Sequence, residues 1–590
     1  MHDMLRGAFM RELALLRDST IEFGRAHPEL APHLGVRATN PHVERLIEGV
    51  AFLAARTAIR VDAEYERLAQ DIVQAIAPDL SCALPPAALV QFKPLLTQDA
   101  AARTIVPRNS ALRYQLASGE EVHFHTAAGL QLSPVELEVL PPPDPDALTR
   151  LFAERGAVTV PPELFHAAII RARLRTARGW RVGSAIDATL DLQCCGAHAG
   201  WLWGSLTRQG ATLALVDPCS GVAQALHPQS ALRPTGWSDD EALLPPECAP
   251  PGPLRLLRES QAWPERFFRM SLDGLPVSLE HWFGDAIDLW WFLPGERAAP
   301  ELAPDALRLF CCPVVALTRR RCEPVTFLGD QYEANVRLPA GSDGQEIVAV
   351  ERVDLRGRDG HITPLHPLHD LDGSELGPQR PCYALRRQPR WQEARGKQQS
   401  PPPFEWMIAP SPVIEDSALL LVTAWASQSV DVLIPDDCRH WRLDVVAGLQ
   451  DVVGVGGAMT PIAAASPLPE TVLRAMSWRI DRLRGLSPSA TATALLDWIR
   501  PFCRAERLPP LRGAVLESDV AAIGGTTVPV YARGWRLTID VEKRAIRDPA
   551  FCLWPHVLAA TLVRQLQAES FIRCIFASAG DPIGEALAWR

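Results

Sequence analysis

Apolar residues recur at helical spacing through the first 80 residues of the chain. The first run comprises Leu5, Phe9, Leu13, Leu16, Thr20 and Phe23, and it ends at His27. A second helix is predicted to begin where Asn40 can act as the N-cap and Pro41 occupies the first helical position. A third is predicted to run from about Asp62 to the residue before Pro78, because proline cannot continue the helical hydrogen bonds. We therefore expect three helices in this region.

The second of these helices carries apolar side chains on two sides. At 100° per residue, its main apolar stripe comprises Val43, Leu46, Ile47, Val50, Leu53, Ala54 and Val61. Phe52 and Ile59 project close to the opposite side. Charged residues flank this second pair, Glu44 and Glu48 on one edge and Arg45 and Arg56 on the other. Such a helix needs either a partner on each face or cover from the rest of its own domain, and the residues alone leave both alternatives open.

Beyond Pro86 the chain changes to short strand-like runs. Ala88–Phe92 and Val135–Val139 have the composition of strands and are separated by Pro, Gly and Asp. This pattern continues to about residue 440. Helical spacing then returns in three segments, Glu470–Leu483, Ala490–Phe502 and the residues after Pro555. Proline is also abundant, 53 of 590 residues, which favours loops and sheet edges over a mostly helical protein.

The length and these changes of pattern predict an α+β, multidomain protein. The polar, proline-rich segment 388–403 is typical of a linker or a long exposed loop. The expected divisions are an N-terminal helical segment (1–80), a β-rich domain (81–295), a second β-rich domain that ends in the linker (296–400), and a mixed α/β C-terminal domain (401–590).

Composition narrows the class of protein. The formal charge of −10 argues against a nucleic-acid binder, which needs a basic surface to neutralise phosphates. Nowhere are there about 18 consecutive apolar residues, so we expect no insertion into a membrane. Thirteen cysteines without a regular framework favour reduced thiols in the cytosol. Nearly all the positive charge is arginine, since the only lysines are Lys93, Lys397 and Lys543.

Candidate chemical sites are few and weak. His123 and His125 would lie on one face of a strand as half of a metal site, but no second pair with ligand spacing matches them. The pairs Cys195/His198 and His366/His369 have the same weakness. No phosphate-binding, zinc-protease or nucleophile-elbow motif occurs in the sequence. We therefore predict no catalytic residue, no cofactor site and no metal site.

Several blocks of the sequence resemble one protein family. The most specific lies near the N-terminus, where Glu22–Gly35 (EFGRAHPELAPHLG) precedes Asn40–Arg56 (NPHVERLIEGVAFLAAR). Further blocks are Asp239–Pro245 (DDEALLP), Leu254–Met270 (LRLLRESQAWPERFFRM), Arg533-Gly534 and Ser570-Phe571-Ile572. Together they resemble the TssF family (VasA, ImpG), whose members are baseplate subunits of type VI secretion systems. Two segments depart from the family pattern, Ala316–Thr318 and Val422–Trp425.

The resemblance implies a non-catalytic structural subunit without a cofactor. Proteins of this family form wedges, each with two copies of the chain and one of TssG. The wedges surround the spike protein VgrG, TssK and TssE attach to them, and the tube and sheath assemble from the baseplate. The implied fold is similar to that of phage baseplate wedge proteins. The implied location is the cytoplasm, docked at the inner membrane face through other subunits.

This implied assembly would give the second predicted helix a role in a wedge bundle. The expected intersubunit face comprises Phe52, Ile59, Arg45, Glu48 and Arg56. In contrast, Glu259 and Phe267-Phe268 are expected to pack within the chain. Two other interpretations are a baseplate protein of another contractile injection system or phage tail and, less favoured, a carbohydrate-active enzyme. The 17 tryptophans could stack on sugars, but they are scattered and serve cores and interfaces equally well.

Overall fold

The computed structural model describes most of the chain, and its described residues form two compact units. One unit is Met1–Ala75 with Leu468–Leu473, and the other is Ile76–Pro467 with Arg474–Arg590. The description covers residues 2–589 except 28–40, 98–102, 117–118, 120, 154–157, 178, 187–188, 209–210, 228–231, 247–248, 294–297, 328–330, 343–344, 358, 369–380, 390–403, 411–418, 429–437, 440, 444–448, 457–468, 505–506, 524–529, 543–548, 567–569 and 579.

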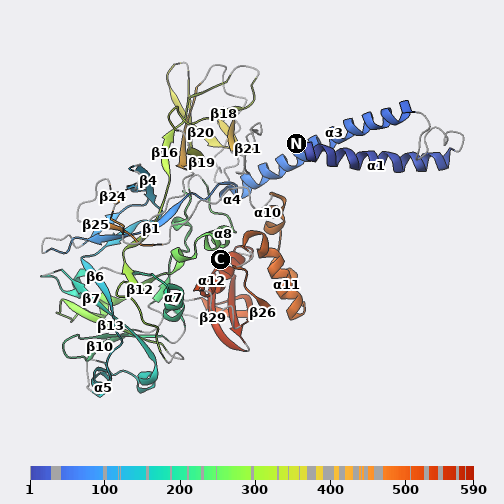
Figure 1. Ribbon diagram of the computed structural model, residues 1–590. Coiled ribbons are helices and arrows are strands. Elements are labelled where there is room, and N and C mark those ends of the chain that lie inside the picture. Colours follow the sequence, from blue (N-terminus) through green and yellow to red (C-terminus); the bar gives the residue numbers. More distant parts are fainter. Residues whose placement is uncertain are drawn as a thin grey trace. The chain divides into compact units, whose positions relative to one another are not determined.

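Two long helices, α1 (His2–Ala26) and α3 (Pro41–Ile76), make up most of the first unit (Figure 1). An ion pair of 2.6 Å between Arg17 and Glu44 joins them near the connection between the two helices. Their most buried side chains are small, since Ala8, Ala51 and Ala55 are at most 2% exposed. Small side chains at a contact allow two helix axes to approach closely. The first predicted helix is confirmed. Asn40, the predicted N-cap of the second helix, lies outside the described residues.

The predicted break between the second and third helices is wrong. α3 continues for 36 residues through Asp62 without interruption. The physical reason is that no proline or glycine follows Gly49 until Pro78, and residues such as Ala, Glu, Arg and Leu favour the helical conformation. Aspartate is common at helix starts. Where no helix breaker precedes it, however, an aspartate is accommodated inside a helix.

A six-stranded sheet in the second unit joins segments that are far apart in the sequence. Its order is β24 (Trp441–Leu443), β3 (Ala111–Gln115), β4 (Glu121–Thr126), β15 (Cys311–Val315), β1 (Ala87–Pro94) and β25 (Leu449–Gly454). β1 pairs antiparallel with both neighbours, so that Val90 lies opposite Cys312 and Gly454. The predicted strand Ala88–Phe92 lies within β1, whose first four residues are all buried. A short separate pair is β2 (Thr104–Val106) with β5 (Leu130–Leu132).

Two smaller sheets follow, each with its own helices. One has the order β10 (Ala223–His227), β9 (Thr212–Val216), β13 (Ala286–Leu293), β7 (Ala168–Thr176) and β6 (Val135–Leu140). Leu151 of α5 (Pro145–Ala153) packs in a cluster with Trp290 and Phe292 of that sheet, close to η1 (Pro162–His166). The other has the order β11 (Leu232–Pro234), β12 (Arg269–Asp273), β8 (Thr189–Cys194) and β14 (Leu307–Leu309).

Short helices connect and cover these sheets. They are α4 (Pro78–Ser81), α6 (Val182–Ala185), α7 (Ala199–Thr207), η3 (Asp239–Glu241), α8 (Arg255–Ala262), η4 (Pro264–Phe267) and α9 (Leu275–Ser278). Three of them come from blocks that resemble the TssF family, since η3 begins the block Asp239–Pro245 and both α8 and η4 lie within Leu254–Met270. Phe267 and Phe268, which follow α8, are at most 2% exposed, so their expected packing within the chain is confirmed.

An eight-stranded sheet contains most of the middle of the chain. Its order is β16 (Thr318–Arg321), β23 (Leu419–Gln428), β19 (Gln345–Arg356), β20 (Ile362–Pro367), β21 (Cys382–Pro389), β22 (Phe404–Pro410) and β18 (Ala334–Val336), and β17 (Val325–Thr326) also pairs with β23. Its longest pairing joins β19 to β23. Most of the predicted linker 388–403 lies outside the described residues.

A mixed four-stranded sheet near the C-terminus carries helices on one face (Figure 1). Its strands are β26 (Leu511–Ile523), β27 (Val530–Val541), β28 (Phe571–Ser578) and β29 (Asp581–Trp589), of which β27 and β28 are parallel. The neighbouring helices are α10 (Pro469–Met476), η5 (Ile480–Leu483), α11 (Pro488–Ile499), η6 (Arg500–Phe502), η9 (Pro549–Leu553) and α12 (Trp554–Val563). Helices therefore lie in all three segments predicted after residue 440, although the first is interrupted at residues 477–479 between α10 and η5.

The structure confirms the α+β, multidomain class with an N-terminal helical segment and β-rich domains. Strand pairing crosses two of the predicted divisions. β1 pairs with β15 and β25, and β22 pairs with β18 and β21, so strands from both sides of residues 295 and 400 share sheets. The positions of the domain boundaries themselves stay predictions.

Candidate functional site

The outer face of α3 carries a row of exposed apolar side chains. Its members are Leu46, Val50, Leu53, Val61, Tyr65, Leu68 and Ile72, and successive members lie three or four residues apart except for a gap of eight between Leu53 and Val61, which is about two helical turns. We call this row the outer stripe. Leu46 is 68% exposed and Leu53 is 62% exposed. Residues at this spacing share one face of a helix. Single exposed leucines are ordinary, whereas seven exposed apolar side chains along one helix face mark an interaction surface.

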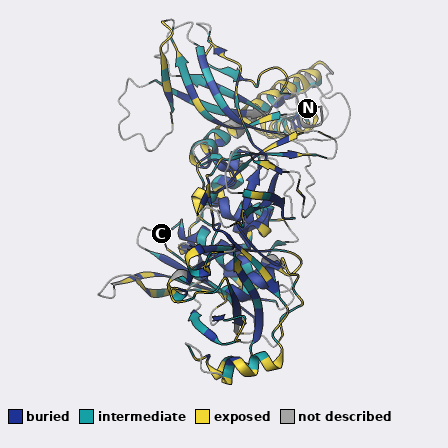
Figure 2. Cartoon of the chain, turned by 90° about the vertical axis from the view of Figure 1, so that its left-hand side faces the viewer, coloured by how far each residue is buried: buried dark blue, intermediate teal, exposed yellow. Residues whose placement is uncertain are grey.

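The predicted main apolar stripe of this helix is therefore mostly exposed. The buried side of α3 is lined by alanines, among them Ala51 and Ala55, which are 0% exposed. Sequence reasoning gave these alanines little weight because larger side chains dominate a hydrophobicity pattern. The helical spacing of these alanines is the sequence signal that could have shown the buried side, since small side chains on one face permit close packing of another helix. Figure 2 shows many exposed positions on the helices beside the N-terminus.

The five residues of the predicted intersubunit face lie on a different side from the outer stripe. Phe52 is 42% exposed and Ile59 is half-buried, while Arg45, Glu48 and Arg56 are exposed. Phe52 and Ile59 are seven residues apart and share a face, roughly 160° around the helix from the middle of the outer stripe. The structure thus places apolar side chains on two faces of α3 besides the alanine side. Whether Phe52 and Ile59 contact another subunit stays a prediction.

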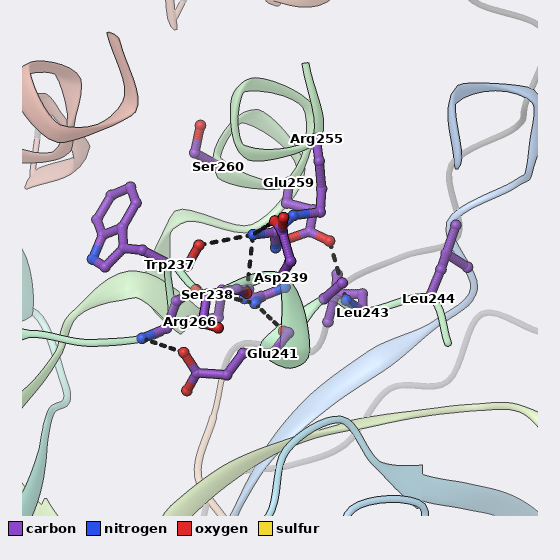
Figure 3. A network of polar contacts seen from close by, with 12 residues as sticks. Trp237, Ser238, Asp239, Glu241, Leu243, Leu244, Arg255, Glu259, Ser260 and Arg266 are labelled. Atoms are coloured by element: carbon purple, nitrogen blue, oxygen red, sulfur yellow. Dashed lines mark hydrogen bonds and ion pairs between the residues drawn. The ribbon is translucent and has the colours of Figure 1, made fainter. Parts of the chain in front are cut away.

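A buried charged network joins the two central blocks that resemble the TssF family (Figure 3). Glu259 of α8 is its centre and is 2% exposed. Its Oε2 atom accepts hydrogen bonds from Arg255 at 3.0 Å and from Arg266 at 2.8 Å. Its Oε1 atom accepts from the backbone N–H of Leu243 at 3.1 Å. One carboxylate therefore holds the Asp239–Pro245 loop against the helix and the turn that follows it.

The arginines of this network extend it to neighbouring backbone and carboxylates. Arg255 donates to the carbonyls of Trp237 and Ser238, at 2.9 and 3.0 Å. Arg266 donates to the carbonyl of Glu241 at 2.7 Å. Burial lowers the pKa of Arg266, and the charge of Glu259 partly offsets this. An isolated buried charge is costly, so each of these groups stabilises the fold only while its partners are present.

A third buried arginine, Arg269 of β12, closes the network on the sheet side. It donates to Asp191 of β8 at 2.7 Å and to Glu241 at 3.2 Å. Burial lowers the pKa of Arg269, but the nearby Asp191 and Glu241 carboxylates outweigh burial and raise it above its ordinary value. The expected role of Glu259 within the chain is confirmed by its contacts. The i,i+4 spacing of Arg255 and Glu259 was a sequence signal for part of this network.

The short helix α4, which follows α3, is held by one partly buried and one buried arginine. Arg258 of α8 donates to the carbonyls of Asp79 and Cys82, both at 2.6 Å. Arg387 of β21 donates to the carbonyl of Ser81. Burial raises the pKa of the Asp79 carboxyl to about 6, although the charge of Arg258 acts in the opposite direction. Side chains from two distant segments therefore satisfy the carbonyls at the end of α4.

The weak metal candidates are not assembled into a site among the residues that the structure describes. His123 is exposed and His125 is half-buried on the same face of β4, and His125 Nδ1 lies 2.5 Å from the carbonyl of Leu317. Cys195 and His198 precede α7, His366 lies in β20, and His369 lies outside the described residues. Within the described ranges, no group of three or more His, Cys, Asp or Glu could hold a metal ion.

Two spaces in the described part of the second unit differ in size. The smaller one, of about 10 Å³, adjoins Asp79 and Glu259 and has at most the room for one water molecule. A larger, open depression of about 400 Å³ is lined by Leu254, Met476, Trp478, Arg479 and Arg564. None of the described helices is long and apolar enough to cross a membrane.

Comparison with known proteins gives a consistent result. The family model described as "Type VI secretion system, TssF" matches residues 1–432. Type VI secretion system component TssF1 of Pseudomonas aeruginosa is 27% identical over 629 aligned residues, covering 100% of this chain and 98% of that protein. This match includes the C-terminal part of the chain, beyond the residues matched by the family model.

Two solved structures are similar in fold. One, determined by cryo-electron microscopy, is a TssK-TssF-TssG baseplate subcomplex of a type VI secretion system. A chain of it matches with a TM-score of 0.69 and 17% identity, over 93% of this chain and 98% of that chain. The other is the baseplate complex from the type VI secretion system, with a TM-score of 0.50, 15% identity, and coverage of 99% and 98%.

Proposed function

The chain belongs to the TssF family of type VI secretion proteins, and from this membership we propose that it is a non-catalytic structural subunit of a secretion baseplate. In this proposal two copies of the chain and one TssG-like protein form a wedge. The wedges surround a VgrG-type spike, and TssK-like and TssE-like subunits attach to them. The assembled ring then nucleates the tube and the sheath. The family and its similarity to the TssK-TssF-TssG subcomplex support this proposal.

The observation that carries the proposal is the outer stripe of α3. Each large apolar side chain contributes roughly 1.5–3 kcal/mol when it is transferred from water to a fully buried site. The seven residues of the outer stripe are each more than 40% exposed. If another protein surface covers this row, the burial of its side chains makes the binding free energy considerably more favourable. A helix-on-helix contact fits a row that keeps to one face of the helix, with steps of three, four or eight residues.

The second face of α3 extends the same proposal. Phe52 and Ile59 share a side that neither the alanines nor the outer stripe occupy. Two apolar faces on one helix are suited to an assembly in which each copy of the chain has two different helical neighbours. We therefore assign the outer stripe to one neighbour and Phe52 with Ile59 to another, in keeping with a wedge of two copies and one partner.

The charged residues of the second unit support a structural role. Glu259 is engaged by two arginines and a backbone N–H, and Glu241 and Asp191 are engaged by Arg269. These groups hold loops together and leave little room for a substrate, since the adjoining space measures about 10 Å³. No observation among the described residues favours the alternative of a carbohydrate-active enzyme. Membership of the TssF family supports type VI secretion over other contractile systems.

A deletion experiment in the source bacterium tests this function. We propose that the protein acts in the cytoplasm and reaches the inner membrane face through other subunits. Removal of the gene should abolish assembly of a fluorescently labelled sheath, and a plasmid copy should restore it. A variant of Phe52→Asp, which alters the proposed bundle face alone, should fail to restore sheath assembly while accumulating to the normal level. Normal sheaths in the deleted strain would overturn the proposal.

A further inference from the structure

The face of α3 that carries Phe52 and Ile59 also carries two exposed arginines. Arg45, Gly49, Phe52, Arg56 and Ile59 are separated by four, three, four and three residues. This is the spacing of one seam along a helix that packs against another helix. We call these five residues the arginine seam. Arg45 and Arg56 are exposed, and they form no ion pair that the structure records in the part of the chain it describes.

The centre of the arginine seam is open. A Cβ atom added to Gly49 would meet no other atom within 4 Å. Glycine at this position therefore leaves a gap between Arg45 and Phe52 on the helix surface. In helix packing, a side chain of one helix fills such a gap on the other. A large apolar side chain of a partner can enter here and contact the Phe52 ring.

Covering this seam with a purely apolar surface would be unfavourable. It would remove the Arg45 and Arg56 guanidinium groups from water without a counter-charge, which costs several kcal/mol for each ion. A carboxylate opposite each arginine removes this cost, because the guanidinium fork binds a carboxylate through two parallel hydrogen bonds. The charge of the seam therefore specifies the charge of the surface that covers it.

We propose that the occupant of the arginine seam is an amphipathic partner helix with an acidic edge. It places a large apolar side chain over Gly49 and carboxylates opposite Arg45 and Arg56. The two arginines are 11 residues apart, which corresponds to about 16 Å along the helix axis. The matching carboxylates on the partner are therefore about three helical turns apart. This inference rests on the proposed function, since it describes the partner of one of the two proposed bundle faces.

The lysine content of the chain offers a direct test. Lys93, Lys397 and Lys543 are its only lysines. A water-soluble carbodiimide joins an amine to a carboxylate as an amide only when the two groups touch. The variants Arg45→Lys and Arg56→Lys keep the positive charge and introduce one amine each at the arginine seam. Each variant is purified in complex with the TssG-like protein of the same bacterium, treated with the carbodiimide and examined by mass spectrometry.

We expect each variant to give a new cross-link from the introduced amine to a carboxylate of another chain in the complex. The matched controls Arg482→Lys and Arg484→Lys also introduce an amine at exposed positions, in the C-terminal part of the chain, and should give no such cross-link. The double variant Arg45→Glu/Arg56→Glu should weaken the complex at least tenfold at low salt, and this difference should shrink at high salt because exposed charges are screened.

The outcomes separate this inference from the function on which it rests. If the complex forms normally, gives no cross-link from either introduced amine and is unaffected by the double charge reversal, that result overturns the proposal of an acidic partner helix and leaves the proposed function intact. A wild-type chain that does not bind the TssG-like protein at any salt concentration overturns the proposed function, and the inference fails with it. Cross-links from the introduced amines to a second copy of the chain would identify that copy, rather than the TssG-like protein, as the source of the acidic edge.

Discussion

Arg266 donates a hydrogen bond of 2.8 Å to Glu259, and both side chains are almost completely buried. Glu259 is shared with Arg255 on the other side, so the removal of one carboxylate leaves two guanidinium groups without their common partner. The blocks Asp239–Pro245 and Leu254–Met270 meet at this point. The packing of the Asp239–Pro245 loop against α8 and the turn after it therefore depends on the single carboxylate of Glu259.

The first prediction follows from this shared carboxylate. Glu259→Ala should lower the free energy of unfolding by about 3–5 kcal/mol, because it leaves buried positive charges unpaired. Glu265→Ala is the matched control, since Glu265 is exposed in the same segment, and it should change stability by less than about 0.5 kcal/mol. Urea unfolding followed by tryptophan fluorescence measures both. Equal stability of the two variants would show that the network contributes nothing to the fold.

The two sides of α3 should respond differently to substitution. Ala51→Leu inserts three extra heavy atoms at a position that is 0% exposed, so it should destabilise the helical unit within the full chain by about 1–3 kcal/mol. Leu53→Asp changes an exposed position and should leave the isolated chain folded, but it should greatly weaken binding to the TssG-like protein. Circular dichroism and a binding assay on both variants test this pair. Unimpaired binding of the Leu53→Asp variant would show that the outer stripe is not part of the interface with the TssG-like protein.

Asp79 makes a prediction about pH. Burial raises its pKa from 3.8 to about 6 in the folded chain, so the folded state binds a proton more tightly than the unfolded state. The contribution of Asp79 to stability is therefore most favourable below about pH 4 and decreases as the pH rises through 6. Asp79→Asn, which cannot ionise, should be more stable than the wild type by about 1–3 kcal/mol at pH 8.

The same comparison at low pH is the control for this effect. Near pH 4 the wild-type carboxyl is protonated in the folded chain, and the two proteins should unfold at nearly the same urea concentration. A stability difference that does not change between pH 4 and pH 8 would mean that ionisation of Asp79 has no part in it.

Gly534 is required by the close approach of a neighbouring strand. It lies opposite Phe571 in the parallel pairing of β27 with β28. A Cβ atom at this position would lie 2.3 Å from the carbonyl oxygen of Phe571 and 2.5 Å from its ring. Gly534→Ala should therefore destabilise the C-terminal sheet by more than about 3 kcal/mol, because backbone cannot move away as a flexible side chain does. Gly7→Ala is the control, since Gly7 lies inside α1 and an added Cβ there would meet no atom within 4 Å, so this variant should not destabilise the protein.

The sequence predicted the local elements well and the long-range contacts poorly. Helical spacing located α1 and α11, and strand composition located β1, because both patterns depend on neighbours within a few residues. The pairing of β1 with β25 joins residues more than 350 positions apart, and no local pattern specifies it. The break predicted at Asp62 failed because a possible cap does not end a helix that has no breaker.

In the candidate site, too, local patterns were predicted and long-range contacts were not. Periodicity correctly placed Phe52 and Ile59 away from the main apolar stripe, but it could not show which face another helix of the same chain covers. The structure assigns that cover to the alanine side, at Ala51 and Ala55. The contact between Glu259 and the N–H of Leu243 depends on the course of a loop, which side-chain patterns do not record. Resemblance to a family identified both blocks of this network without showing that they meet.

The most direct test of the wedge proposal is the mass of the complex in solution. The chain is co-expressed with the TssG-like protein of the same bacterium, purified through a tag on that partner, and measured by native mass spectrometry. We predict a stable complex with two copies of this chain and one of the partner, and loss of at least one copy when the chain carries Phe52→Asp. A wild-type chain that elutes as a monomer and does not associate with the partner would contradict it.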